Sequence, residues 1–216
     1  MKRALALVLS CLAAPLGAHP HIFVDTGFAI VTDEAGRVTH VRVTWAYDAL
    51  FSLLVTEERG LDPDGDAVLT PREEAALTGF DANWIEGYNG DLVATVGGVP
   101  VALGRPEAPT ATMREGRIVT THLRAVAGTP RLAGGEMTLK PYDPTFYTAY
   151  EVALGLSVEG LDGCEIDRVE PDLDAEMQEL QSLLSELTQD QDTVEMGYPE
   201  VGENFATEVR IACAGS

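Results

Sequence analysis

The chain has 216 residues, of which 45% are hydrophobic, and its formal net charge is −21. This length and composition suit one domain with a real core. The strongly acidic charge argues against nucleic acids and anionic membranes as partners. The charge fits a cation-binding protein, although an acidic surface also serves solubility alone.

The first 18 residues have the pattern of a secretory signal peptide. The pattern begins with the basic pair Lys2 and Arg3, continues as an apolar run, and ends on small residues at Ala18. A lipoprotein signal cut before Cys11 fits less well, because its apolar run would be very short. We therefore expect residues 19–216 to be the mature protein, exported to the periplasm and without a membrane span.

Alternation of polar and apolar residues predicts a β-hairpin over residues 22–47, with a turn at 33–36. A helix over 49–60 follows and ends in glycine, and a second helix over 71–87 begins with proline. Further strands are expected at 92–103 (two, around Gly97 and Gly98), 110–126 (a hairpin turning at Glu115 and Gly116), 136–140, 151–158, 166–169 and 205–213.

The clearest helix spans residues 175–187, with Asp174 as a predicted N-cap. Two interpretations of its apolar stripe stay open: packing on the sheet, or docking of a partner. Residues 189–204 are expected to form a loop. Together these elements predict an α+β fold, a mostly antiparallel β domain over 19–216 with a helix-loop-helix insertion at 49–88 and a C-terminal amphipathic helix. The stripe consists of Met177, Leu180, Leu184 and Leu187.

Cys164 and Cys213 remain once the signal peptide is removed. In an oxidising compartment two cysteines most simply form one disulfide. This staple would close a loop of about 50 residues, worth about 3–4 kcal/mol in the chain-entropy model. A metal site is the alternative, although the two cysteines lack the close spacing of zinc ligands.

The segment between the first two helices, DPDGDAVLTPRE, matches the twelve-residue calcium loop of an EF-hand. Calcium takes six to eight oxygen ligands, and this spacing supplies them from alternate positions and a closing glutamate. The predicted calcium ligands are Asp62, Asp64, Asp66, Val68 (through its carbonyl), Thr70 and Glu73.

Ala67 departs from this motif, which has glycine at the sixth position because the backbone there is left-handed. An alanine in that conformation costs about 1 kcal/mol. Weak calcium binding and a metal-free acidic turn are both compatible with this residue. Since only one such loop occurs, we expect a structural site rather than a calcium switch.

Two of the four histidines, His19 and His21, follow the expected cleavage point. The free α-amine and ring of His19 could chelate a metal, and Pro20 excludes a chelate through its own amide because it has no N–H. Pairing Val31 with Val38 in the hairpin would place Asp48 opposite His21.

The set His19, His21 and Asp48 would suit Zn²⁺, Ni²⁺, Co²⁺ or Cu²⁺. His122 and Asp143 are more distant candidates for the same site. Solvated histidines at an exposed terminus are the alternative. No catalytic motif such as GxSxG, HExxH or a P-loop occurs, so we predict no enzyme. A copper oxidase built on His19 would need His122 beside it.

Five segments in this order resemble a bacterial periplasmic family of unknown function, often labelled "ABC-type uncharacterised transport system, periplasmic component". They are HPHIFVD, WAYDALFS, DPDGD, YDPTFYTAY and FATEVRIAC. Members of that family are often encoded beside nickel/cobalt or zinc transporters. The resemblance implies a metal-binding accessory role beside a membrane metal transporter. The alternative is a non-catalytic adaptor that docks a membrane partner through helix 175–187 or the YDPTFY segment, with calcium purely structural.

Overall fold

Two β-sheets form most of the structure, a computed structural model that describes residues 20–186 and 200–215. The first sheet has the strand order β5-β6-β2-β1-β8, with β9 also paired to β1, and the second has the order β10-β11-β7-β3-β4. The α+β class is confirmed, and most pairs are antiparallel, whereas β8 and β9 run parallel to β1.

The strands of the first sheet are β1 (Ile22–Thr32), β2 (Val38–Tyr47), β5 (Leu103–Arg114), β6 (Arg117–Val126), β8 (Thr148–Glu151) and β9 (Leu156–Glu159). Those of the second sheet are β3 (Leu92–Val96), β4 (Val99–Pro100), β7 (Glu136–Pro141), β10 (Cys164–Val169) and β11 (Glu208–Cys213). The predicted turns at Gly97 and Gly98 and at Glu115 and Gly116 therefore join β3 to β4 and β5 to β6.

The two sheets share one hydrophobic core. Val24 and Val43 of the first sheet and Leu139 and Val209 of the second are buried in the same cluster. On β2 the predicted alternation is confirmed, because Val41, Val43, Trp45 and Tyr47 are all buried. A period of two thus places one face of each strand against the opposite sheet.

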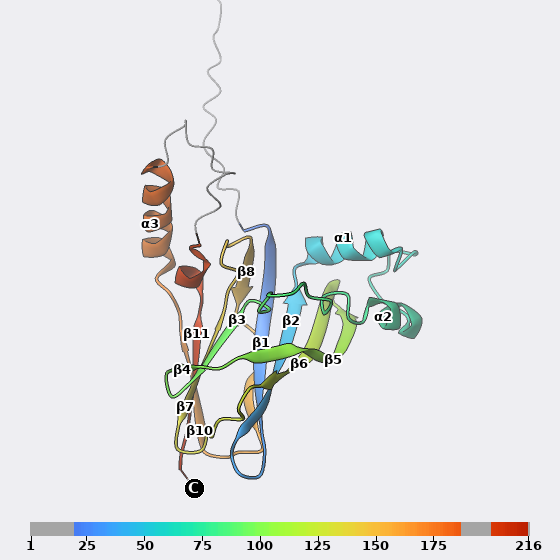
Figure 1. The fold of residues 1–216 in the computed structure, drawn as a ribbon. Helices are drawn as coiled ribbons and strands as arrows, with labels where there is room; N and C mark the ends of the chain where they lie inside the picture. The colour runs from blue at the N-terminus through green and yellow to red at the C-terminus, as the bar shows by residue number, and fades with distance from the viewer. Residues whose placement is uncertain (1–19, 187–199, 216) are drawn as a thin grey trace, which may run out of the picture.

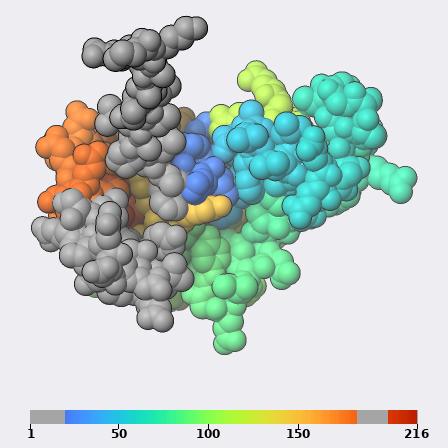
Figure 2. Space-filling view, turned by 90° about the horizontal axis from the view of Figure 1, so that it is seen from above, coloured from blue at the N-terminus to red at the C-terminus, as the bar shows by residue number. Residues whose placement is uncertain are grey.

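The α-helices of the described residues are α1 (Ala49–Arg59), α2 (Pro71–Leu77) and α3 (Leu173–Glu186). Figure 1 shows α1 and α2 at the right, beside the first sheet, and α3 at the left, beside β11 of the second sheet. Seen from above in Figure 2, the blue start of β1 lies beside the cyan α1. No helix within residues 20–186 and 200–215 is long and apolar enough to cross a membrane.

Several predicted boundaries are wrong. The helix expected over 71–87 ends at Leu77, because Thr78 leaves the helical conformation (φ −53°, ψ 126°) and Gly79 takes a positive φ of 78°. The strand expected over 151–158 is divided into β8 and β9. The last strand begins at Glu208, after a short 3-10 helix, η1 (Gly202–Phe205).

The C-terminal helix also differs from its prediction. It begins at Leu173, and its first turn is capped by Asp172 rather than Asp174, since the Asp172 carboxylate accepts the N–H of Ala175 at 3.2 Å. Of its predicted stripe, Met177 is 39% exposed and Leu180 is half-buried, and the apolar Leu173 at the start of the helix is 59% exposed. Leu187 and most of the loop predicted at 189–204 lie outside the described residues.

The predicted register of the first hairpin is wrong by two residues. Val31 pairs with His40, and an irregularity between Val31 and Thr32 then places Thr32 opposite Val38. The turn closes where the Asp33 N–H donates to the Arg37 carbonyl, so it is longer than the sequence pattern indicates. The bulge and the longer turn together shift every later pair.

The predicted disulfide is confirmed. Cys164 and Cys213 face each other in the β10–β11 ladder, their Cα atoms lie 4.0 Å apart, and their sulfurs are bonded. This bond joins the outer strand of the second sheet to its neighbour near the end of the chain. A disulfide at this position fits an oxidising compartment.

Candidate functional site

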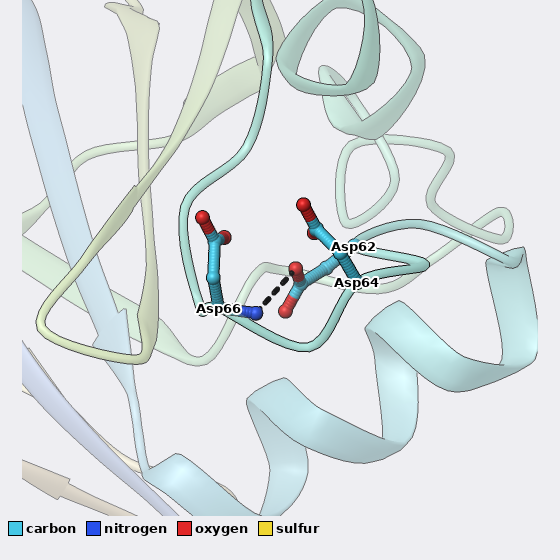
Figure 3. A group of neighbouring side chains, drawn as sticks. All are labelled: Asp62, Asp64 and Asp66. Atoms are coloured by element: carbon cyan, nitrogen blue, oxygen red, sulfur yellow. Dashed lines mark hydrogen bonds between the residues drawn. The ribbon is translucent and has the colours of Figure 1, made fainter.

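The loop between α1 and α2 gathers three carboxylates. One oxygen from each of Asp62, Asp64 and Asp66 lies within 4.8 Å of the others (Figure 3). The loop is held by Asp62, whose two carboxylate oxygens accept the N–H groups of Asp66 at 3.1 Å and Ala67 at 3.0 Å. Asp64 and Asp66 are exposed, so their remaining oxygen lone pairs face solvent.

The backbone of this loop is tightly wound. Positive φ angles occur at Asp62 (53°), Gly65 (68°) and Ala67 (60°). Ala67 therefore has the left-handed conformation that normally favours glycine. Leu69 is buried and anchors the loop to the core, whereas the side chain of Val68 is exposed.

Glu73 is engaged elsewhere. One of its carboxylate oxygens accepts the Asp62 N–H at 3.2 Å, and the other accepts the N–H and hydroxyl of Thr70 at 2.8 and 2.7 Å. The hydrogen bonds from Thr70 are the main cause that lowers the pKa of Glu73. Thr70 and Glu73 form a capping box that starts α2, so they tie the loop ends together. The structure thus does not bring Glu73 into the aspartate cluster.

This donor set fits a hard divalent cation. Three carboxylates at such short range repel one another, and a bound cation would relieve that repulsion. Carboxylate oxygens are the ligands that Ca²⁺ prefers, and exposed loops suit its variable coordination. Asp62, Asp64 and Asp66 are the residues that would hold the ion, and calcium itself would supply charge neutralisation there.

The second predicted metal set is not assembled as expected. Asp48 lies beside Phe23, and its carboxylate accepts the N–H groups of Phe23 at 3.0 Å and Phe51 at 2.9 Å. It therefore caps α1 instead of facing His21, because the hairpin register differs from the predicted one. The ring of His21 lies 4.9 Å from that of Tyr147. His19 lies outside the described residues.

Asp143 and His122 do not complete this set. The Asp143 carboxylate accepts the N–H groups of Thr145 at 2.8 Å and Thr148 at 3.0 Å, so it holds its own turn. His122 is paired with Val43 deep in the first sheet and is 3% exposed. A copper site joining it to the N-terminal histidines therefore has no support within the described part of the chain.

His122 instead belongs to an aromatic cluster in the core. Its ring lies 4.9 Å from Trp45 and 5.6 Å from Trp84, edge to face with both. Its Nε2 has no hydrogen-bond partner within the described residues. Burial lowers the pKa of His122 to about 4, so the imidazole is neutral at pH 7.

The buried face of β6 also carries Arg124. Its guanidinium donates to the carbonyls of Gly104 at 2.9 Å and Asn89 at 2.7 Å, and lies 4.7 Å from the Trp84 ring centroid. Burial lowers the pKa of Arg124 to about 10. The alternation from Ile118 to Val126 already places both Arg124 and His122 on the apolar face, and this signal was available in the sequence.

Two aspartates beyond α2 accept hydrogen bonds from phenols. Asp81 accepts the hydroxyl of Tyr47 at 2.9 Å, and Asp91 accepts those of Tyr88 at 2.8 Å and Tyr150 at 2.9 Å. Burial raises the pKa of both carboxyls, that of Asp91 to about 6. These contacts hold the segment 78–91 against the first sheet. Neither aspartate stands out in the sequence, because Tyr47 and Tyr150 are distant in the chain, and nothing in the sequence indicates that Tyr88 bonds to Asp91.

Comparison with curated proteins gives no match. A family model described as "Protein of unknown function (DUF1007)" matches residues 4–213. This match covers all of the strands and helices described above. The chain therefore belongs to the DUF1007 family of proteins of unknown function.

Proposed function

We propose that this protein is a non-enzymatic, exported accessory of a nickel, cobalt or zinc transport system, that it binds divalent metal ions, and that its EF-hand-like loop holds calcium. The observation that carries the proposal is the convergence of Asp62, Asp64 and Asp66 on one point of an exposed loop. The predicted export signal and the resemblance to proteins encoded beside metal transporters support the rest.

The calcium site is tested by calorimetric titration of the exported chain with CaCl₂. Asp64→Asn is the sharpest variant, because Asp64 belongs to the cluster while Asp62 holds the loop backbone. We expect binding with a Kd on the order of 10⁻⁴–10⁻³ M, typical of extracellular modules, and a loss of at least about tenfold in Asp64→Asn. Asp174→Asn, an exposed carboxylate on α3, is the matched control.

The proposed loop site is contradicted if the wild type gives no heat of calcium binding, or if Asp64→Asn gives the same heat as the wild type. A loss in the Asp174→Asn control as well would show only general attraction to an acidic surface.

Transition-metal binding is proposed for His19 and His21 and is tested separately. Elemental analysis of protein purified from the periplasm with its native N-terminus identifies the metal. Titration with Zn²⁺, Ni²⁺, Co²⁺ and Cu²⁺ then compares this protein with His21→Ala and with a form extended by one residue before His19. Equal binding by all three forms contradicts the histidine site.

A second candidate function is a non-catalytic adaptor in which calcium is purely structural. The exposure of Leu173 and Met177 on α3 favours it, because an amphipathic helix that leaves its apolar residues in solvent has a surface available for a partner. Metal content separates the two functions: an adaptor would carry no stoichiometric transition metal after export.

A further inference from the structure

An apolar groove with a volume of about 440 Å³ lies between the edge strand β8 and helix α3. One wall is formed by five consecutive residues, 148–152, which include all of β8. The other wall is formed by Leu173 and Met177 of α3 and Phe205 of η1. The groove therefore runs along a strand edge and has an apolar side opposite that edge.

Apolar side chains at this groove face solvent. Phe23, Leu173 and Met177 all line it, and Phe23 is 53% exposed. These residues come from β1 and α3, which are far apart in the sequence, so the patch is made by the fold and not by one segment. Exposed apolar patches of this kind mark sites of interaction.

The edge of β8 is open on the side away from β1. β8 is the last strand of its sheet, and no other strand within the described ranges pairs with that edge. The Tyr147 carbonyl accepts the N–H of His21, which lies on the β1 side, so Thr148 and Tyr150 point their backbone groups away from β1. The N–H of Thr148 does bond on that outer side, to Asp143. The backbone of Tyr150 is thus placed to pair with an added strand.

The rim of the groove is acidic. Among the described residues that line it there are four carboxylates and no lysine or arginine. Asp25 is neutralised by Arg117 at 2.6 Å, and Asp143 is bonded within its turn. Glu151 and Glu170 are exposed and make no ion pair with the described part of the chain, so their charge is available to an incoming cationic side chain.

We propose that this groove binds an extended segment of a partner protein by strand addition to β8. The segment would place apolar side chains against Leu173 and Met177, and lysine or arginine beside Glu151 and Glu170. A second copy of this chain is a poorer occupant, because its net charge of −21 opposes the acidic rim. The inference rests on the adaptor function above, and its test uses no metal.

The probe is a fluorescein-labelled, eight-residue peptide of alternating valine and lysine, titrated by fluorescence anisotropy with the exported chain. The double variant Glu151→Lys/Glu170→Lys is expected to weaken binding at least about tenfold. Its charge-matched control is Glu57→Lys/Glu58→Lys on the exposed end of α1, which is expected to bind the peptide like the wild type.

The apolar wall is tested with Met177→Asp, for which we expect a similar loss, against Ile85→Asp, whose residue is 78% exposed and does not line the groove. A peptide methylated on every amide nitrogen cannot donate to a strand along either of its edges and is expected not to bind. All substituted side chains are exposed, and circular dichroism melting verifies that each variant is folded.

Four results would overturn the proposal. They are equal binding of an alternating valine–glutamate peptide, equal loss in the groove variants and their controls, full binding by the methylated peptide, and a wild-type dimer in sedimentation that Met177→Asp dissociates. The last result would assign the groove to a second copy of the chain. A failed calcium or zinc titration has no bearing on any of these outcomes.

Discussion

The acidic loop and the buried polar cluster use the same residue, aspartate, in opposite ways. Asp62, Asp64 and Asp66 lie close to one another on an exposed loop. Asp81 and Asp91 lie apart, and each is bonded to tyrosine hydroxyls in a mostly apolar environment. The number of carboxylates in a chain therefore predicts little about function. The partner of each carboxylate decides whether it is available to bind a ligand or stabilises the fold.

The largest expected effect is on stability, at Asp91. Asp91→Leu removes the acceptor of two phenols, Tyr88 and Tyr150, and leaves both donors without their present partner. We expect a loss of about 2–4 kcal/mol in the free energy of unfolding, measured by urea titration. Asp64→Leu in the loop is expected to change it by less than about 0.5 kcal/mol. Equal losses at both positions would break the contrast between the two regions.

The pH dependence of stability sharpens the contrast further. The pKa of Asp91 is about 6 in the folded protein and 3.8 in the unfolded reference, so the native state binds more protons between these values. Its contribution to the free energy of unfolding therefore increases as pH falls through this window, by about 3 kcal/mol in total. Asp91→Asn is expected to remove this gain, as measured by urea unfolding between pH 4 and 8.

His122 makes a contribution of the opposite sign to the pH dependence of stability. Its pKa is about 4 in the folded protein and 6.5 in the unfolded reference, so the unfolded state binds more protons between these values. Stability from this group is lost as pH falls from 6.5 to 4, by about 3 kcal/mol. In the wild type the contributions of Asp91 and His122 to the pH dependence of stability largely cancel. His122→Leu should therefore gain stability on acidification, and a flat profile in both single variants would contradict this balance.

Calcium is expected to act on the loop alone. At 10 mM calcium and the proposed affinity, binding adds about 1–3 kcal/mol to the free energy of unfolding. This increment should be lost in Asp64→Asn and retained in Asp91→Asn, because only the first belongs to the proposed site. Magnesium at the same concentration is the ionic control. An equal increment in both variants would place the effect outside the loop.

The smallest expected effect is at Ala67. Its φ of 60° is already left-handed in the structure, so Ala67→Gly relieves strain of about 1 kcal/mol without any metal. Thermal melting in the presence of a chelator should show this gain. A gain that appears only with calcium would mean that the metal, and not the folded chain, imposes the left-handed turn.

Local patterns predicted the parts of the structure that local contacts determine. The alternation in β2, the Gly60 end of α1, the left-handed position of Ala67 and the start of α2 at Pro71 all depend on residues a few positions apart. The disulfide also followed from the two cysteines that remain once the predicted signal peptide is removed.

Long-range features were not predictable in the same way. The bulge between Val31 and Thr32 leaves no mark in the alternation, so the register of Asp48 was wrong. Asp91 meets Tyr150 across 59 positions, a pairing that only the packed sheets create. The alternation of β6 places His122 and Arg124 on its apolar face, where polar residues are unexpected. Only the structure shows that Trp84 packs against both side chains.

The capping role of Asp48 links two parts of the chain that would otherwise open separately. A single carboxylate bonds the N–H of Phe23, near the start of β1, and that of Phe51, in the first turn of α1. The amide hydrogens of Phe23 and Phe51 should therefore exchange with the same protection factor. Fraying of the amino terminus and unwinding of the helix before the acidic loop then become a single opening event.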